Sequence, residues 1–348
     1  MTGSPLTLLI PGSATDGTIC GKAVYFAPKT DSEEGTMPRM MVPFSFAAVV
    51  AAGLVSCSSS SSPSSPLSAV ASPRFAIAFS AGASGGVQDI YVIRTDGSGL
   101  RRLTHGSAKE FTPSWSPDGR WIAYRHQPGS DESGEIYVIR ADGSGARNLT
   151  RNPAGDYAPA WSPAGKWIAF ASARGSAQGI PDIYVMKGDG SGVRRLTRNS
   201  DIDEYPTWSP DSKRIVFSST AGVGFSGESR VLWVMNADGS QLRQLSHGPY
   251  DMRPAWSPDG KRIAYESSRG APASTPRTIW VMNADGSHRR RVIRGVGEHP
   301  GWSADGKNIV YAAYPVGIGV VDARKPGTAR VIARAVGPVT FPAWKPTG

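Results

Sequence analysis

The stretch Pro254-Ala-Trp-Ser-Pro-Asp-Gly-Lys-Arg-Ile-Ala-Tyr265 decides the fold, because close copies of it recur along the chain. Four more copies cover residues 113–124, 159–170, 206–217 and 300–311, and a truncated sixth copy ends the protein at residues 342–346. The tryptophans of the six copies lie 42 to 48 residues apart: Trp115, Trp161, Trp208, Trp256, Trp302 and Trp344. A period in this range is typical of a propeller with four-stranded blades.

One full repeat reads as four short strands joined by turns. The Ser-Pro-Asp-Gly sequence at 257–260 predicts a turn, because proline presets φ at the second position and glycine tolerates the last one. The Asp-Gly pair at 285–286 predicts a hairpin. Alternating and β-branched residues predict strands at 254–257, 262–266, 278–282 and 289–293.

The two ends of the repeat region complete each other. Residues 75–79 match the second strand of a repeat but lack the tryptophan strand before it, whereas residues 342–344 form a tryptophan strand with nothing after it. Together they make one repeat. We therefore expect an all-β, six-bladed β-propeller of four-stranded antiparallel blades, closed by the C-terminal strand joining the N-terminal blade.

The repeat resembles a known family. The patterns P-x-W-S-P-D-G-K-x-I-A-[FY] and I-Y-V-M-N-A-D-G-S are similar to the WD-like repeat of the TolB propeller family, over residues 75–346. TolB is a periplasmic protein of the Tol-Pal envelope system, with a separate α/β domain before its six-bladed propeller. The resemblance implies a TolB-like propeller at 73–348, in a lipoprotein variant that lacks the N-terminal domain.

The segment before the propeller predicts export. Residues 1–36 show no sustained periodicity, and we expect them to be disordered or to precede the true start. Residues 37–57 combine one arginine, an apolar run and Leu54-Val-Ser-Cys57, which resembles the lipobox of bacterial lipoproteins. The Ser/Pro tract at 58–72 cannot form a core and reads as a tether. An ordinary signal peptide with an incidental Cys57 is the alternative to a lipid anchor.

Composition narrows the classes of function. The 348 residues include 39% hydrophobic residues, enough for a large core, and only two cysteines, Cys20 and Cys57, too few for a disulfide framework. The formal net charge is +10, but the arginines gather at the predicted outermost strands, where charge blocks edge-to-edge pairing. Attraction to anionic lipid is the alternative. We expect no nucleic-acid partner, because no basic stripe interleaved with aromatic residues is present.

The predicted topology separates a uniform face from a variable one. The two turns of every repeat lie on one face, whereas the loops between second and third strands lie on the other and differ from blade to blade. Binding tends to reside in loops held by a rigid scaffold. The variable face is therefore the candidate surface.

Acidic residues recur on that face, three residues before most of the repeat prolines. Six-fold geometry predicts that they gather around the channel mouth, where they could bind a partner or a cation such as Ca²⁺. The alternative is that each carboxylate caps a local turn. The candidate partner-binding or cation residues are Glu110, Asp156, Asp203, Asp251, Glu298 and His299.

No pattern in the sequence assembles a catalytic site. The sequence Gly301-Trp-Ser-Ala-Asp305 comes within one residue of a nucleophile elbow, but it lies in the repeat frame and no helix follows it. We expect a non-catalytic, monomeric protein without a cofactor, exported and tethered to the bacterial envelope, that binds a protein, peptide or glycan through its variable face. The alternative is a metal-assisted hydrolase or lyase with its site at the channel mouth.

Overall fold

A computed structural model describes ten stretches of the chain: residues 7–10, 22–25, 77–82, 86–129, 134–222, 229–248, 250–268, 276–314, 317–335 and 339–346. The expected signal segment 37–57 with Cys57 and the tether 58–72 lie outside these ranges. Within the ten stretches the regular structure is β-strand, without helices. The described residues contain no helix that is long and apolar enough to cross a membrane.

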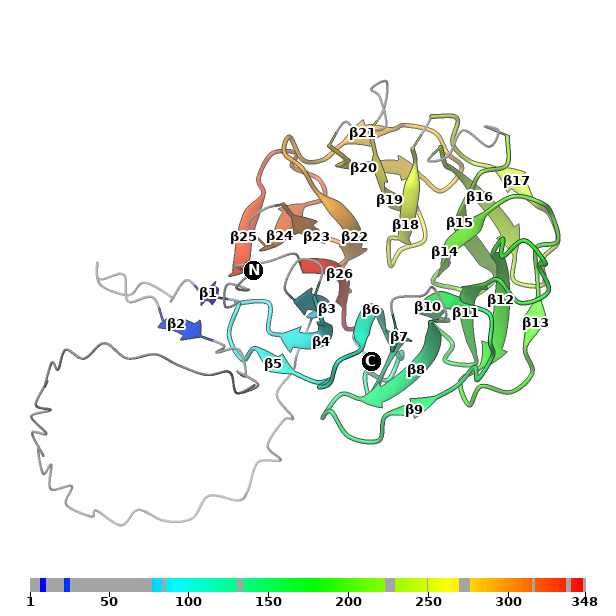
Figure 1. Ribbon diagram of the computed structural model, residues 1–348. Coiled ribbons are helices and arrows are strands. Elements are labelled where there is room, and N and C mark those ends of the chain that lie inside the picture. Colours follow the sequence, from blue (N-terminus) through cyan, green and yellow to red (C-terminus); the bar gives the residue numbers. More distant parts are fainter. Residues whose placement is uncertain are drawn as a thin grey trace, which may run out of the picture. The chain divides into compact units, whose positions relative to one another are not determined.

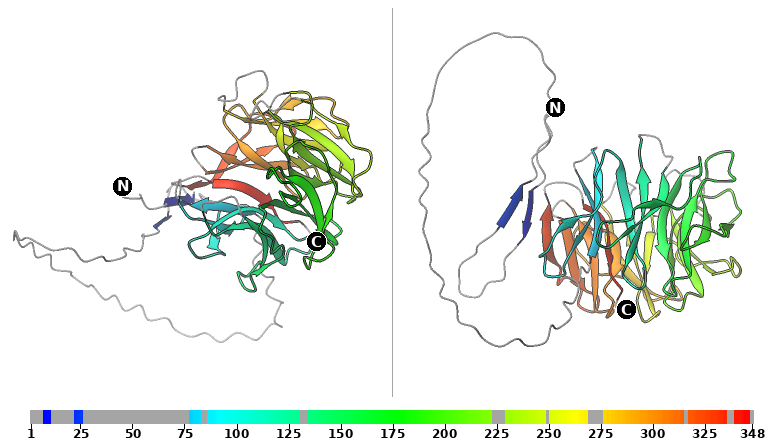
Figure 2. Two further views of the ribbon diagram at one scale, coloured as in Figure 1. Left: turned by 45° about the vertical axis from the view of Figure 1, so that its right-hand side comes forward. Right: turned by 90° about the horizontal axis from the view of Figure 1, so that it is seen from below.

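Six blades surround a common centre, which confirms the predicted six-bladed propeller (Figure 1). Each blade has four antiparallel strands, and the first of them is innermost. The strands run along the axis of the ring, as the side view in Figure 2 shows. The strands of blades 1 to 3, from the centre outward, are β26 (Val339–Trp344), β3 (Ile77–Gly82), β4 (Gln88–Ile93) and β5 (Arg101–Arg102); β6 (Lys109–Trp115), β7 (Trp121–Gln127), β8 (Glu135–Arg140) and β9 (Arg147–Asn148); and β10 (Asp156–Trp161), β11 (Trp167–Ser172), β12 (Asp182–Lys187) and β13 (Arg194–Arg195).

Blades 4 to 6 repeat the same order, and blade 6 carries extra strands at its outer edge. Its sheet continues through β1 (Thr7–Ile10), which pairs with β25, to β2 (Lys22–Tyr25). The strands of blades 4 to 6 are β14 (Asp203–Trp208), β15 (Arg214–Ser219), β16 (Val231–Asn236) and β17 (Arg243–Gln244); β18 (Met252–Trp256), β19 (Arg262–Ser267), β20 (Thr278–Asn283) and β21 (Arg290–Arg291); and β22 (Glu298–Trp302), β23 (Asn308–Ala313), β24 (Gly317–Asp322) and β25 (Arg330–Ala335).

The C-terminal strand closes the ring, as predicted. Strand β26 pairs with β3 in antiparallel register, with Trp344 opposite Ile77 and Val339 opposite Ala81. The chain therefore enters the first blade beside the end of the last strand. The contact between β26 and β3 is the seam that holds both ends of the propeller.

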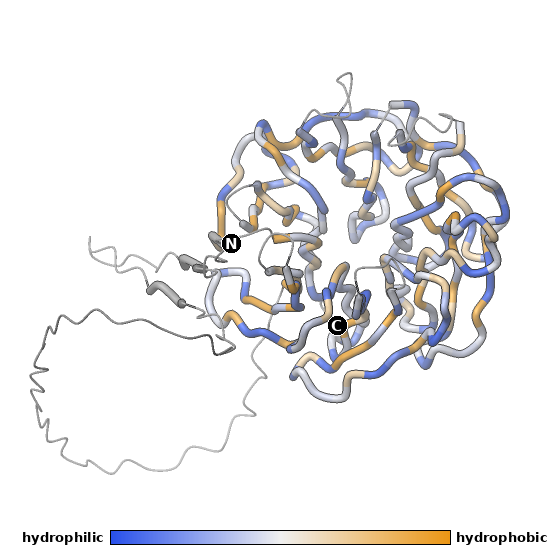
Figure 3. The backbone as a smooth tube through the Cα atoms, viewed as in Figure 1, coloured by the Kyte–Doolittle hydropathy of each residue, from blue (hydrophilic) through white to orange (hydrophobic). Residues whose placement is uncertain are grey.

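The hydrophobic core lies between neighbouring blades rather than at one centre. The aromatic residue near the middle of a second strand is fully buried in several blades, as for Phe170, Phe217 and Tyr265. It packs against the apolar residues of its own blade and of the preceding one. Figure 3 shows hydrophobic residues concentrated along the strands, with hydrophilic residues in many of the connections. Each large apolar side chain buried in this way contributes about 1.5 to 3 kcal/mol.

The strand register confirms that the two kinds of connection lie on opposite faces. The connection from the first to the second strand is five residues long in blades 2 to 6, and the connection from the third to the fourth is six or seven in all blades. The connection from the second to the third strand varies from three residues in blade 6 to eleven in blade 4. We call the uniform side the turn face and the variable side the loop face.

Candidate functional site

A β-bulge in every innermost strand shapes the centre of the propeller. In each blade the register of the first strand breaks at the residue pair that ends in the repeat proline. The residue before that proline has a positive φ, between 49° and 55°. A bulge of this kind re-aims its side chain. We call the six residues the channel ring: Thr112, Ala158, Tyr205, Arg253, His299 and Phe341.

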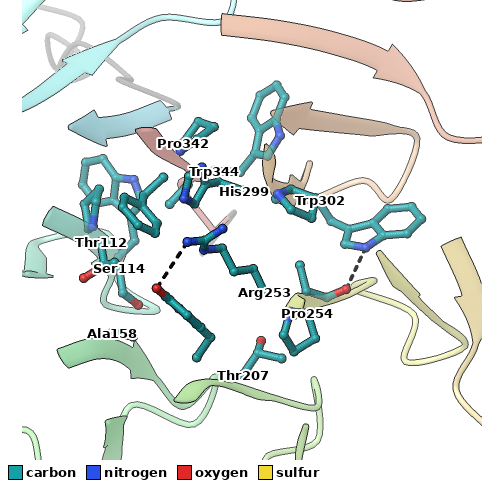
Figure 4. A pocket seen from close by; sticks show the side chains of 18 of the residues that line it. Thr112, Ser114, Ala158, Thr207, Arg253, Pro254, His299, Trp302, Pro342 and Trp344 are labelled. Atoms are coloured by element: carbon teal, nitrogen blue, oxygen red, sulfur yellow. Dashed lines mark hydrogen bonds between the residues drawn. The ribbon is translucent and has the colours of Figure 1, made fainter. Parts of the chain in front are cut away.

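The channel ring lines a central cavity of about 270 Å³, seen in close-up in Figure 4. A second cavity of about 480 Å³ opens on the turn face and is lined by the six repeat tryptophans and by prolines. Trp115, Trp302 and Trp344 border both cavities. The repeat tryptophans therefore form part of the wall of the channel.

Large side chains crowd one side of the channel ring. Arg253 Nη2 donates a hydrogen bond to the Tyr205 hydroxyl at 3.3 Å, and the guanidinium lies 4.7 Å from the centre of that ring. Phe341, three blades away from Tyr205, stacks with it at 6.4 Å between ring centres. The ring centres of His299 and Phe341 lie 3.8 Å apart. These contacts narrow the channel from the side of blades 4 to 6 and blade 1.

The small residues of the ring leave a passage on the opposite side. Thr112 and Ala158 belong to blades 2 and 3, and they also border a pocket of about 190 Å³. Aromatic rings line that pocket, and Arg125 lies 4.7 Å from the ring centre of Tyr157 and 5.9 Å from that of Phe111. Phe111 and Tyr157 precede the bulge, so the pocket lies on the loop side of the channel ring.

A buried charge network supports Arg253. Its Nη1 lies 2.8 Å from Glu266 Oε2, and Glu266 Oε1 accepts a hydrogen bond from the backbone N–H of His299 at 2.5 Å. Arg277 approaches Glu266 at 4.0 Å and Glu298 at 3.9 Å. Burial lowers the pKa of His299 well below its usual range, and the charges of Arg253 and Arg277 lower it further. His299 is therefore a neutral imidazole at pH 7.

Three side chains of this network have the atoms to hold a metal. Glu266, Glu298 and His299 offer ligand atoms that all lie within 4.8 Å of one another. The two carboxylates, however, already face the guanidinium groups of Arg253 and Arg277. These four charges sum to zero, so the cluster has no excess negative charge to offset the dehydration of a cation. The arrangement does not favour a metal ion.

The candidate residues identified from the sequence take two different positions. His299 borders the central cavity, and Glu298 Oε2 lies 4.0 Å from its Nδ1. Glu110, Asp156, Asp203 and Asp251 are buried and are not among the residues that line the three cavities. The side chains of these four acids therefore do not form the walls of the described cavities.

Three of these buried acids contact side chains of a second strand or of a nearby loop. Asp156 accepts a hydrogen bond from Arg174 at 2.7 Å, and Glu110 lies 2.9 Å from His126 Nδ1. Asp203 accepts hydrogen bonds from Ser219 at 2.5 Å and from Asn199 at 3.2 Å. Burial raises the pKa of Asp203 to about 6. The partners are side chains rather than the backbone N–H groups of a turn cap.

Sequence reasoning missed most of the channel ring. Its members share no chemistry, so no residue type recurs along the sequence at these positions. Their common signal is their place directly before the repeat proline. A residue before proline usually adopts extended backbone, and the positive φ found here was not foreseen.

The outer arginines act between blades and within them. Arg194 donates to the carbonyl of Ala237 at 3.3 Å, and Arg289 donates to that of Leu245 at 2.9 Å, in each case across a blade boundary. Arg102 instead pairs with Asp89 of its own blade at 2.7 Å. Arg102 and Arg194 lie on two-residue outer strands and Arg289 directly precedes one, which agrees with edge protection. The contacts of Arg194 and Arg289 also link neighbouring blades.

Comparison with known proteins identifies the family. The model of the TolB β-propeller domain matches residues 127–293 and 206–348. Comparison with curated protein sequences gives no match.

Solved structures share the fold. TolB from Acinetobacter baumannii is 23% identical, with a TM-score of 0.64 over 78% of this chain and 67% of that one. A putative TolB from Agrobacterium tumefaciens is 20% identical, with a TM-score of 0.57 over 79% of this chain and all of that one. A chain of a nidogen/laminin complex is 13% identical, with a TM-score of 0.59 over 79% of this chain and all of that one. Since the family model spans more than half of the sequence, the chain belongs to the TolB β-propeller domain family.

Proposed function

We propose that this protein is a non-catalytic, envelope-tethered propeller that binds a protein, peptide or glycan partner through the loop face around its channel. The observation that carries the proposal is the contrast between the two faces. The turn-face connections have nearly constant length, whereas the loop-face connections vary from three to eleven residues. A uniform scaffold that holds variable loops is the usual arrangement of a recognition surface.

The chemistry of the loop-side pocket supports recognition. Phe111, Tyr157 and Arg125 provide aromatic surface and a guanidinium group at one place. Aromatic and arginine side chains are the residue types that contribute most to binding at interfaces. The nidogen/laminin complex contains a chain of this fold, so a propeller can serve in an assembly of proteins.

The non-catalytic part of the proposal rests on the charge network. A metal-assisted hydrolase or lyase needs an ion at the channel mouth. Glu266 and Glu298 are the carboxylates that lie together with His299 of the channel ring, and they already face Arg253 and Arg277. Charges that are already paired in this way are more typical of a rigid binding site than of a metal-dependent catalytic site.

Photo-crosslinking in intact cells tests which face binds. Phe111 and Trp121 are half-buried aromatic residues of blade 2 at opposite ends of the channel axis. Each is replaced in turn by p-benzoylphenylalanine, which preserves an aromatic ring. We expect a discrete crosslinked adduct from position 111 and none from position 121. Adducts from position 121 alone would move the interface to the turn face and overturn the proposal.

Cell fractionation tests the tether. We expect the native chain in the membrane fraction and the Cys57→Ala variant in the soluble fraction, because the variant has no thiol to carry a lipid. Cys20→Ala, which removes the other cysteine, is the matched control and should remain with the membrane. Equal distribution of the Cys57→Ala variant and the native chain would contradict a lipid anchor.

A further inference from the structure

Three members of the channel ring hold polar atoms that lack a partner. Thr112 Oγ1, Arg253 Nε and both ring nitrogens of His299 are buried without a hydrogen-bond partner in the described part of the chain. The Glu298 carboxylate lies 4.0 Å from His299 Nδ1, which is beyond hydrogen-bond distance. Buried polar groups in proteins are nearly always hydrogen-bonded. Four such atoms in one ring indicate a position for a ligand.

All three residues line the same central cavity. His299 is only 6% exposed, and it borders the cavity together with Thr112 and Arg253 (Figure 4). The neutral imidazole has one donor and one acceptor, Arg253 Nε is a donor, and the threonine hydroxyl can act as either. A ligand that satisfies them must both donate and accept hydrogen bonds.

The charges near the cavity exclude a strongly ionic ligand. Glu266 pairs with Nη1 of Arg253, Tyr205 accepts a hydrogen bond from its Nη2, and Arg277 faces Glu266 and Glu298. An anion would compete with Glu266 for Arg253, and a cation would meet two guanidinium groups. A neutral ligand leaves this balance undisturbed.

The remaining walls define the shape of the ligand. Tyr205 and Phe341 present aromatic surface to the cavity. A volume of about 270 Å³ lies just below the range of about 300 to 1,000 Å³ that is usual for drug-sized ligands. The cavity therefore suits one small ring that has apolar faces and several hydroxyl groups at its edge.

We propose that the central cavity binds a neutral sugar ring, held by hydrogen bonds from Thr112, Arg253 and His299 and packed against Tyr205 and Phe341. This site lies deeper in the channel than the loop-side pocket. It does not depend on whether the loop face binds a protein. A peptide also carries donors and acceptors, but a polypeptide needs a continuous groove, whereas Arg253, Tyr205 and Phe341 crowd this channel.

Saturation-transfer NMR on the full chain tests the proposal with named probes. N-acetylglucosamine and methyl β-glucoside are the neutral sugars, glucuronate is the anionic sugar, and N-acetyl-triglycine amide is the peptide. We expect saturation transfer to at least one neutral sugar, and a weaker signal for glucuronate and for the peptide. The photo-crosslinking experiment reports on the loop face separately, so either result can fail without the other.

Substitution of His299 assigns the binding to the cavity. Phenylalanine removes both ring nitrogens, and Phe341 shows that this residue type accepts the same positive φ. We expect His299→Phe to weaken sugar binding by about tenfold, since hydrogen bonds to two ring atoms are lost. His288→Phe is the matched control, because His288 also has a positive φ but is exposed on a turn. This control should bind as the native chain does.

A second variant keeps the test valid if the first one unfolds. Thr112→Val removes the hydroxyl with little change of shape and should weaken binding several-fold. Three results would overturn the proposal: no saturation transfer to either neutral sugar, stronger binding of glucuronate or the peptide, or unchanged sugar binding in both folded cavity variants.

Discussion

At the scale of single residues, an acid repeated along the sequence serves the blades more than the channel. Asp203 is fully buried, and Ser219 and Asn199 hydrogen-bond to it. Burial raises its pKa from 3.8 to about 6. The folded state therefore holds a proton between these two pH values that the unfolded chain has lost. The free energy of unfolding must fall as the pH rises through this window.

The variant Asp203→Asn tests this linkage. Asparagine does not titrate, so we expect the stability of the variant relative to the native chain to increase between pH 4.5 and pH 7.5. The shift of about two pKa units sets an upper limit of about 3 kcal/mol on this increase. Urea unfolding at the two pH values measures it. Asp238→Asn, at an exposed turn, is the control and should show no such increase. A constant difference for Asp203→Asn would refute the linkage.

The residue scale also shows where sequence reasoning reached its limit. Carboxylates at a fixed distance from the repeat proline were easy to recognise because they share one chemistry. The direction in which these carboxylates point was not recognisable. A β-bulge lies between each acid and the repeat proline, and it directs the side chain of the residue before the proline toward the channel. Tyr205 and Arg253 reach the channel for that reason, although neither stands out in the sequence.

At the scale of the elements, the sequence predicted the hairpin turns but not their contacts between blades. Gly286 in the Asp-Gly turn of blade 5 has a φ of 93°, as expected for such a turn. A Cβ at this position would lie 2.4 Å from the carbonyl oxygen of Leu245, which follows the outermost strand of blade 4. The turn therefore requires glycine both for its backbone and for its packing on the neighbouring blade.

Replacement of this glycine should be costly. We expect Gly286→Ala to lower the free energy of unfolding by about 1 to 3 kcal/mol, because alanine is strained at this φ and its Cβ meets a backbone oxygen. Gly295→Ala is the control, because a Cβ added at that position would meet no atom within 4 Å and the φ there is not positive. Thermal unfolding of the two variants measures the difference. Equal melting temperatures would show that the turn can adjust without cost.

At the scale of the whole molecule, the fold was predictable because one pattern is repeated six times. The tryptophan of each copy fixes the first strand, and the incomplete copies at 75–79 and 342–346 fix both the number of blades and the way the ring closes. The channel was less predictable, because its wall combines one residue from each blade. Phe341 and Tyr205 meet across three blades, and no local pattern reports such a contact.

Closure of the ring places all six members of the channel ring at one centre, so the site and both binding proposals depend on it. The direct measurement is the thermal unfolding of a chain that ends at Ala335, compared with a chain that ends at Pro346. The shorter chain loses β26 with Phe341 and Trp344, and it exposes β3.

We expect the chain ending at Ala335 to melt at least about 10 °C lower than the chain ending at Pro346, or to lack a cooperative transition. One kcal/mol corresponds to about 2 to 4 °C for a domain of 150 to 250 residues, and an entire strand and its packing are lost. Melting temperatures within about 2 °C of each other would contradict the closed ring, because β26 would then contribute nothing to its stability.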